Sequence, residues 1–216
     1  MIRIVKAIVL TLVAALQTVN AQAADAPKTE PALLSVGLVV DNSGSYRLLL
    51  DRVIDLASNI VDQKGGDDEM FLVTFVDTSK IVLRQDFTHV KSDLHDAAEN
   101  MFIEGGQTAI LDALKFSARL FSESENAPAN SQRILILISD GDERNSAAKL
   151  DDVLKLLKDE KIRVYVIAIS DERLNTKLLD RIAKDTGGEK FVPKTRADIA
   201  SVAKQIWPAL MQKAPR

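Results

Sequence analysis

The chain has 216 residues, of which 46% are hydrophobic and 27% charged, and its formal net charge is −3. This composition is that of an ordinary globular protein, and the length suffices for one sizeable hydrophobic core. The net negative charge argues against a nucleic-acid-binding protein, and the absence of cysteine excludes a disulfide framework.

Residues 1–23 show the features of a secretory signal peptide in their usual order. Arg3 and Lys6 precede an apolar run, Ala7–Leu16, and the small residues of Ala21-Gln22-Ala23 follow. The apolar run is well short of the roughly 20 residues that a spanning helix needs. We therefore expect cleavage after Ala23, no stable membrane span in the mature chain, and a secreted or periplasmic bacterial protein. An uncleaved membrane anchor is the alternative.

Residues 24–32 are polar and contain two prolines, which predicts a short linker. From residue 33 to residue 212, strand-like and helix-like patterns alternate without an internal repeat, which predicts one domain. The expected elements, in chain order, are strand Leu33–Val40, helix Tyr46–Gln63, strands Met70–Val76 and Ile81–Leu83, helices Val90–Met101 and Thr108–Phe121, strand Ile134–Ile138, helix Ala147–Asp159, strand Arg163–Ile169, helix Leu174–Thr186, strand Lys190–Val192 and helix Ala197–Met211.

These patterns predict an α/β fold with a doubly wound, mostly parallel sheet and helices on both faces. The longer strands are nearly continuous apolar runs, as in strands that are buried on both sides. The short segment Ile81–Leu83 follows Met70–Val76 after a brief polar turn and is expected to be an antiparallel edge strand. Ligands of such folds bind at the carboxyl ends of the strands, where the strand order reverses.

Oxygen-bearing side chains follow the first strand at every second position. Asp41, Ser43 and Ser45 would point to the same side of an extended loop, and Gly44 would let the backbone turn. Asp140 stands at the end of another buried strand, and Thr108 follows the Gly105-Gly106 break. Thr108 could simply cap the helix that follows it, or it could complete a cluster of oxygen ligands with the other four residues.

The donor types favour a hard divalent cation. The sequence has no cysteine, and its two histidines are remote from these loops, which argues against zinc and copper. Two carboxylates with several hydroxyls suit Mg²⁺, with Mn²⁺ and Ca²⁺ as alternatives. A cation held in this way would still accept an anionic ligand from outside, such as a carboxylate of a partner protein.

These residues resemble the metal-ion-dependent adhesion site of von Willebrand factor type A domains. The Asp-x-Ser-x-Ser pattern of Asp41–Ser45, the separate Thr108 and the separate Asp140 match that motif completely and in order. The resemblance spans roughly Leu33–Met211 and implies the Rossmann-like fold of that family. The stretch Leu137–Ser146, with the sequence LISDGDERNS, is most similar to bacterial secreted members.

The resemblance also implies a role for each residue. Ser43 and Ser45 would bind the metal directly, and Asp41 would act through water or by fixing the loop. Thr108 and Asp140 would exchange between direct and water-mediated contact, and the partner would supply an Asp or Glu carboxylate. Two further acidic residues would lie on the rim and tune which partners approach: Asp142 and Glu143.

Two other functions compete with this non-enzymatic binding module. One is a magnesium-dependent phosphohydrolase with Asp41 as the nucleophile, but Ser43 stands where such an enzyme needs a second aspartate as general acid. The other is a structural subunit of an envelope assembly, in which the metal would contribute to stability alone.

Overall fold

The computed structural model describes residues 33–128, 131–170 and 174–211. All described residues belong to one compact unit of the chain, Ala32–Arg216. The expected signal peptide, residues 1–23, and the expected linker, residues 24–32, lie outside the described residues.

A six-stranded sheet with the order β3-β2-β1-β4-β5-β6 forms the centre of this unit. Neighbouring strands are parallel except for the antiparallel pair β2 and β3. The predicted doubly wound, mostly parallel sheet with one antiparallel edge strand is therefore confirmed. The strands are β1 Leu34–Asp41, β2 Glu69–Phe75, β3 Ile81–Thr88, β4 Gln132–Ser139, β5 Arg163–Ala168 and β6 Lys190–Phe191.

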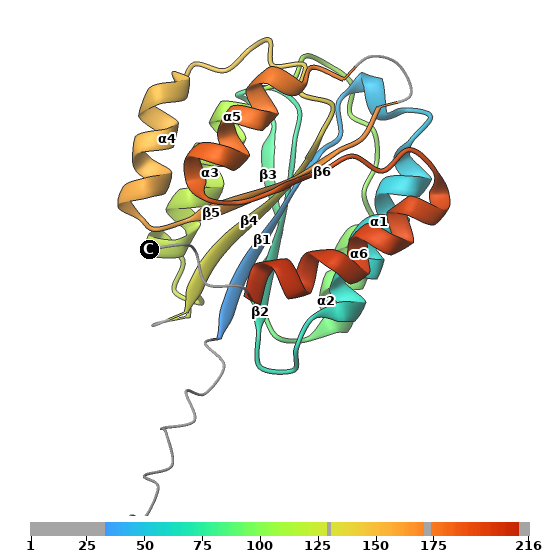
Figure 1. The fold of residues 1–216 in the computed structure, drawn as a ribbon, viewed down its shortest axis with the longest axis vertical. Coiled ribbons are helices and arrows are strands. Elements are labelled where there is room, and N and C mark those ends of the chain that lie inside the picture. The colour runs from blue at the N-terminus through green and yellow to red at the C-terminus, as the bar shows by residue number, and fades with distance from the viewer. Residues whose placement is uncertain (1–32, 129–130, 171–173, 212–216) are drawn as a thin grey trace, which may run out of the picture. The chain divides into compact units, whose positions relative to one another are not determined.

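Helices cover both faces of the sheet, as Figure 1 shows. One face packs against α1, α2 and α6, and the other against α3, α4 and α5. Their bounds are α1 Leu50–Gln63, α2 Lys91–Glu99, α3 Ile110–Glu123, α4 Leu150–Asp159, α5 Thr176–Thr186 and α6 Arg196–Met211, and a 3₁₀ turn, η1, spans Gly44–Tyr46. No helix within the described ranges is both long and apolar enough to cross a membrane.

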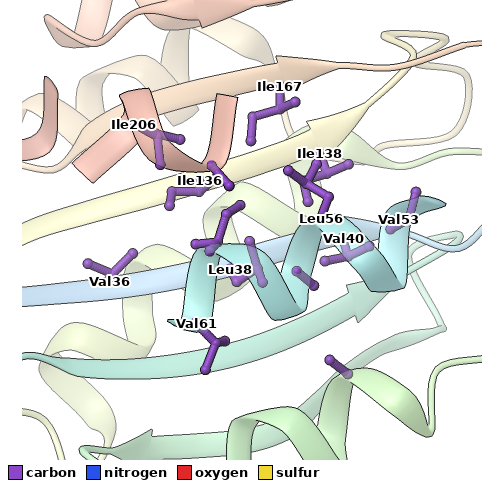
Figure 2. Packing of buried hydrophobic residues seen from close by; sticks show 14 of the residues in the cluster. Val36, Leu38, Val40, Val53, Leu56, Val61, Ile136, Ile138, Ile167 and Ile206 are labelled. Carbon is purple, nitrogen blue, oxygen red and sulfur yellow. The ribbon is translucent and has the colours of Figure 1, made fainter. Parts of the chain in front are cut away.

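The central strand β1 is buried along its whole length because both of its faces meet helices. On one face Leu38 and Val40 contribute to the cluster that contains Leu56 of α1 and Ile206 of α6 (Figure 2). On the other face Val39 belongs to the cluster under α3, α4 and α5. Burial on both sides explains why the strand is an apolar run rather than an alternating pattern.

Five of the six predicted helices begin later than the sequence suggested, and the difference is largest in two of them. The segment predicted as Tyr46–Gln63 starts with the η1 turn, and the regular helix begins only at Leu50. The segment predicted as Ala147–Asp159 becomes helical at Leu150, because the amides of Ala147 and Ala148 donate to the carboxylate of Asp112 instead. Both differences concern loops at the carboxyl ends of β1 and β4.

The last turn of α6 is tied to other elements by hydrogen bonds to backbone carbonyls. The indole of Trp207 donates to the Ile60 carbonyl of α1 at 2.8 Å. The Tyr165 hydroxyl donates to the Ala209 carbonyl at 2.8 Å, and the Arg163 guanidinium donates to the Leu210 carbonyl at 2.6 Å. Trp207 is thus a buried packing residue that also satisfies the end of another helix.

Candidate metal centre

Asp41 and Asp140 leave the sheet at the point where the strand order reverses. From β1 the chain passes through α1 to β2 on one side, and from β3 it returns through α2 and α3 to β4 on the other side. Because β1 and β4 are parallel neighbours, their carboxyl ends lie next to each other. This is the place where doubly wound folds bind their ligands.

The loop after β1 gathers three of the predicted oxygen donors. The Asp41 carboxylate accepts from the Ser43 amide and from the Ser139 hydroxyl, both at 3.0 Å. The hydroxyl oxygens of Ser43 and Ser45 lie 3.1 Å apart. The 3₁₀ turn Gly44–Tyr46 brings Ser45 to this place, rather than the extended loop that the two-residue spacing predicted.

Tyr46 anchors the loop after β1 to the segment that follows β5. Its side chain is buried, and its hydroxyl donates to the Ile169 carbonyl, just beyond β5, at 3.0 Å. Burial raises the pKa of the Tyr46 hydroxyl well above its ordinary value, and the negative charges of Asp41 and Asp140 raise it further. The hydroxyl therefore stays protonated, and its hydrogen bond joins the loop after β1 to the end of β5.

Thr108 contacts the same cluster and does not cap the helix after it. Its hydroxyl donates to the Ser43 hydroxyl at 3.2 Å, and its side chain is buried. Helix α3 begins at Ile110, and the residue in its N-cap position is Ala109. The simple capping role that the sequence allowed for Thr108 is therefore not the one that it has here.

The two carboxylates of the cluster are buried and influence each other. Asp41 is 1% exposed and Asp140 is 5% exposed. Burial raises the pKa of Asp41 to about 7; hydrogen bonds from Ser43 oppose this rise, and the charge of Asp140 adds to it. Within the described part of the chain, neither carboxylate forms a salt bridge.

This donor set fits a hard cation whose shell is built largely from hydroxyls. No group of three or more His, Cys, Asp or Glu side chains that could hold a metal occurs among the described residues. The cluster instead joins two carboxylates to the hydroxyls of Ser43, Ser45 and Thr108. Carboxylate and hydroxyl oxygens suit Mg²⁺, and the role of these five residues as ligands stays a prediction.

Several residues on the loops around the cluster are exposed. Leu48 is 83% exposed and Phe102 is 52% exposed. The guanidinium of Arg84 lies 4.9 Å from the centre of the Phe102 ring and pairs with Glu104 at 2.7 Å. Asn42 donates to the Phe102 carbonyl at 3.0 Å, so these contacts join the loop before α3 to the loop after β1.

Sequence reasoning missed Ser139 and did not foresee the contact that Glu143 makes with α3. Ser139 holds one oxygen of Asp41, although its position at the end of an apolar strand gave no hint of this contact. Glu143 is half-buried, and its carboxylate accepts from the Leu111 amide of α3 at 3.0 Å, a contact that the expected place on the rim did not include. No usable signal for this contact was present in the sequence, because the predicted helix began at Thr108, a residue that can cap a helix, and this start concealed that Ala109 in the observed N-cap position has no side-chain acceptor. Asp142, in contrast, forms an ion pair with the exposed Arg144.

Comparisons with known proteins agree with this architecture. The family model described as "von Willebrand factor type A domain" matches residues 35–206. The collagen alpha-6(VI) chain of Homo sapiens is 28% identical over 144 residues, or 63% of this chain, and the chain spans only 6% of that relative's length.

Solved structures share the fold at low sequence identity. A von Willebrand factor type A structure from Catenulispora acidiphila has a TM-score of 0.72 at 16% identity, covering 83% of this chain and 43% of that one. An aerotolerance-related membrane protein from Bacteroides fragilis has a TM-score of 0.66 at 21% identity, and the match covers 82% of this chain and 98% of that one.

Proposed function

Since the chain belongs to the von Willebrand factor type A domain family, a family of protein-interaction modules, we propose that it binds a partner protein through a divalent cation. The residues that would hold the cation are Asp41, Ser43, Ser45, Thr108 and Asp140. The partner would supply an aspartate or glutamate carboxylate.

The observation that carries this proposal is the pair of buried carboxylates. Asp41 and Asp140 are almost fully buried, and the charge of Asp140 raises the pKa of Asp41. The net cost of a buried charge without a partner is several kcal/mol in proteins, so such groups are normally paired or bound to a metal. A divalent cation would neutralise both carboxylates at once.

The contacts of each residue support a division of roles. One oxygen of Asp41 accepts from the Ser43 amide, and the other accepts from the Ser139 hydroxyl. These contacts favour a role for Asp41 in fixing the loop or in acting through water. The hydroxyls of Ser43 and Ser45 lie side by side and are suited to direct contact. Thr108 adds a third hydroxyl next to Ser43.

Magnesium is the cation that we propose, with manganese and calcium as alternatives. Mg²⁺ prefers oxygen ligands and commonly retains waters, which matches a shell with few carboxylates and several hydroxyls. When bound, the ion would supply positive charge and an exchangeable position for an outside carboxylate. Exposed residues on the neighbouring loops, among them Leu48, Phe102 and Arg144, would be available to contact the partner.

The enzymatic alternative has less support. A phosphohydrolase would need Asp41 as an accessible nucleophile, but its side chain is 1% exposed and both of its oxygens are engaged. Ser43 also occupies the position of the general acid that such a mechanism requires. We therefore propose a non-enzymatic module, with a structural subunit of an envelope assembly as the second candidate. The signal-peptide features of residues 1–23 support export to the periplasm or the cell exterior.

The test is capture of envelope proteins by the immobilised chain in Mg²⁺ and in chelator. Capture that needs Mg²⁺ and is lost in Asp41→Ala supports the proposal. Asp67→Asn is the control, because it removes an exposed acidic charge that precedes β2, at the edge of the sheet opposite the proposed ligands. Equal capture by Asp41→Ala and the wild type in Mg²⁺ would contradict the proposed roles. Asp41-dependent turnover of a phosphate ester would restore the enzymatic alternative.

A further inference from the structure

Glu143 faces the beginning of α3, and both of its carboxylate oxygens are engaged there. One oxygen accepts from the Ser146 amide at 2.9 Å. The other accepts from the Leu111 amide at 3.0 Å and from the Ser146 hydroxyl at 2.9 Å. Glu143 is thus engaged in protein contacts through both of its carboxylate oxygens.

These contacts supply the cap that α3 lacks in its own sequence. The first amides of a helix have no partner within the helix, and Ala109 in the N-cap position has no side-chain acceptor. Glu143 and the Ser146 hydroxyl accept from Leu111, and the same hydroxyl accepts from the Asp112 amide at 3.2 Å. The negative charge of Glu143 also interacts favourably with the positive end of the helix dipole.

The start of α3 holds the loop after β4 in return. The Thr108 carbonyl accepts from the amides of Arg144 and Asn145 at 2.9 and 3.2 Å. The Asp112 carboxylate accepts from the amides of Ala147 and Ala148, both at 2.8 Å. We call this set of reciprocal contacts between residues 108–112 and residues 143–148 the α3 clamp.

The α3 clamp lies between two of the proposed metal ligands. Thr108 is its first residue, and the Thr108 hydroxyl lies 3.2 Å from the Ser43 hydroxyl. Asp140 stands at the start of the other loop, three residues before Glu143. The clamp therefore joins the segment that begins with Thr108 to the loop that begins with Asp140.

We propose that Glu143 is a positioning residue, which holds Thr108 and Asp140 in a preformed arrangement for the cation. The inference rests on the proposed function, because it assigns a task to Glu143 at that same site. It replaces the expectation that Glu143 lies on the rim and selects partners. Groups that orient metal ligands in this way typically change metal affinity by roughly 10-fold to 100-fold when they are altered.

The test is the Mg²⁺ affinity of the 216-residue chain, measured by isothermal titration calorimetry for Glu143→Gln and Asp142→Asn. Both variants lose one acidic charge from the same loop, but only Glu143 belongs to the α3 clamp. The amide nitrogen of Gln cannot accept from Leu111 or Ser146, so we expect roughly 10-fold to 100-fold weaker binding. Asp142→Asn breaks only an exposed ion pair and should change the affinity by no more than about fivefold.

A melting curve without metal separates positioning from simple stabilisation. If Glu143 served stability alone, Glu143→Gln would lower the melting temperature of the metal-free chain and keep the wild-type Mg²⁺ affinity; that result overturns the inference. Equal losses of affinity in the two variants would also overturn it, since charge alone would then explain both. Ser146→Ala is a milder variant for the case in which Glu143→Gln does not fold, and it must weaken Mg²⁺ binding in the same direction.

The behaviour of the wild type distinguishes this inference from the proposed function. A wild-type chain that binds no Mg²⁺, Mn²⁺ or Ca²⁺ refutes the proposed function, and the inference with it. A wild-type chain that binds Mg²⁺, with Glu143→Gln binding equally well, refutes the positioning role alone.

Discussion

A Cβ atom on Gly141 would lie 2.2 Å from the carbonyl oxygen of Asn175. The amide of Asn175 in turn donates to the carbonyl of Asp140 at 3.0 Å. Gly141 also has a φ of +83°, in the left-handed region where side chains are strained. The loop that contains Asp140 is thus pressed closely against the start of α5, and only glycine fits at this position.

Gly141→Ala should destabilise the protein more than Gly187→Ala does. Gly187 has a similar φ of +74°, but a Cβ there meets nothing within 4 Å, so that variant experiences conformational strain alone, about 1–2 kcal/mol. Gly141→Ala adds the clash with Asn175 and should also weaken Mg²⁺ binding by moving Asp140. Urea unfolding and Mg²⁺ titration of both variants check this, and equal costs would contradict the clash.

Asp41→Asn should affect the metal-free and metal-bound proteins in opposite directions. The change keeps the shape of the side chain and removes a buried charge that Asp140 repels, so the metal-free chain should melt at the same or a higher temperature. The wild type should gain stability from Mg²⁺, by about 2.7 kcal/mol at 100 times Kd, and lose it in chelator. The variant should show little response. Melting curves with Mg²⁺ and with chelator measure both effects, and a normal Mg²⁺ response in Asp41→Asn would exclude Asp41 from the site.

Asp112→Asn should reduce stability at neutral pH and have a smaller effect in acid. Burial raises the pKa of Asp112, but hydrogen bonds from Thr78, Ala147 and Ala148 outweigh it, and the pKa is lowered overall from 3.8. A carboxyl whose pKa is lower in the folded state adds stability above its unfolded pKa and loses it as the pH falls through the folded value. Urea unfolding at pH 7 and near pH 3 should therefore show a larger difference between variant and wild type at pH 7. If the difference in free energy of unfolding between variant and wild type were the same at both pH values, the charge of Asp112 would contribute nothing to stability.

Trp207→Phe should lower the free energy of unfolding by about 1–3 kcal/mol, since the Ile60 carbonyl at the end of α1 loses its indole donor. The Mg²⁺ affinity should not change, because the contacts of the five proposed ligands come from other elements. Urea unfolding and calorimetry measure the two quantities separately. A large loss of affinity would show that α6 and the site are coupled.

The fold and the location of the candidate site follow from the sequence for a simple reason. Parallel strands end at the same edge of a sheet, so an aspartate after each of two buried apolar runs places Asp41 and Asp140 together. The apolar runs are long, and the glycine pairs that end helices are clear, so the order of elements was predicted correctly. The loop bounds were not, because the η1 turn and the late start of α4 depend on contacts with distant residues.

The contact between Glu143 and the beginning of α3 could not be predicted from the sequence, for a related reason. An acidic residue shortly after Asp140-Gly141 is typical of a solvated loop, and only the exact start of α3 reveals the need for an acceptor. The predicted helix began at Thr108, which could have capped it, so the missing cap at Ala109 stayed hidden. One error of two residues in a helix boundary thus concealed the role of a side chain 34 positions later in the chain.

The hydrogen bonds at the end of α6 also set a threshold for any displacement of that helix. Sliding it by one turn, about 5.4 Å, would break the bonds to Ile60, Ala209 and Leu210 together. At about 1 kcal/mol for each bond, the present position is favoured roughly a hundredfold by these three contacts. A partner that moved α6 would have to bind the displaced form at least that much more tightly, so a weak ligand would leave the helix where it is.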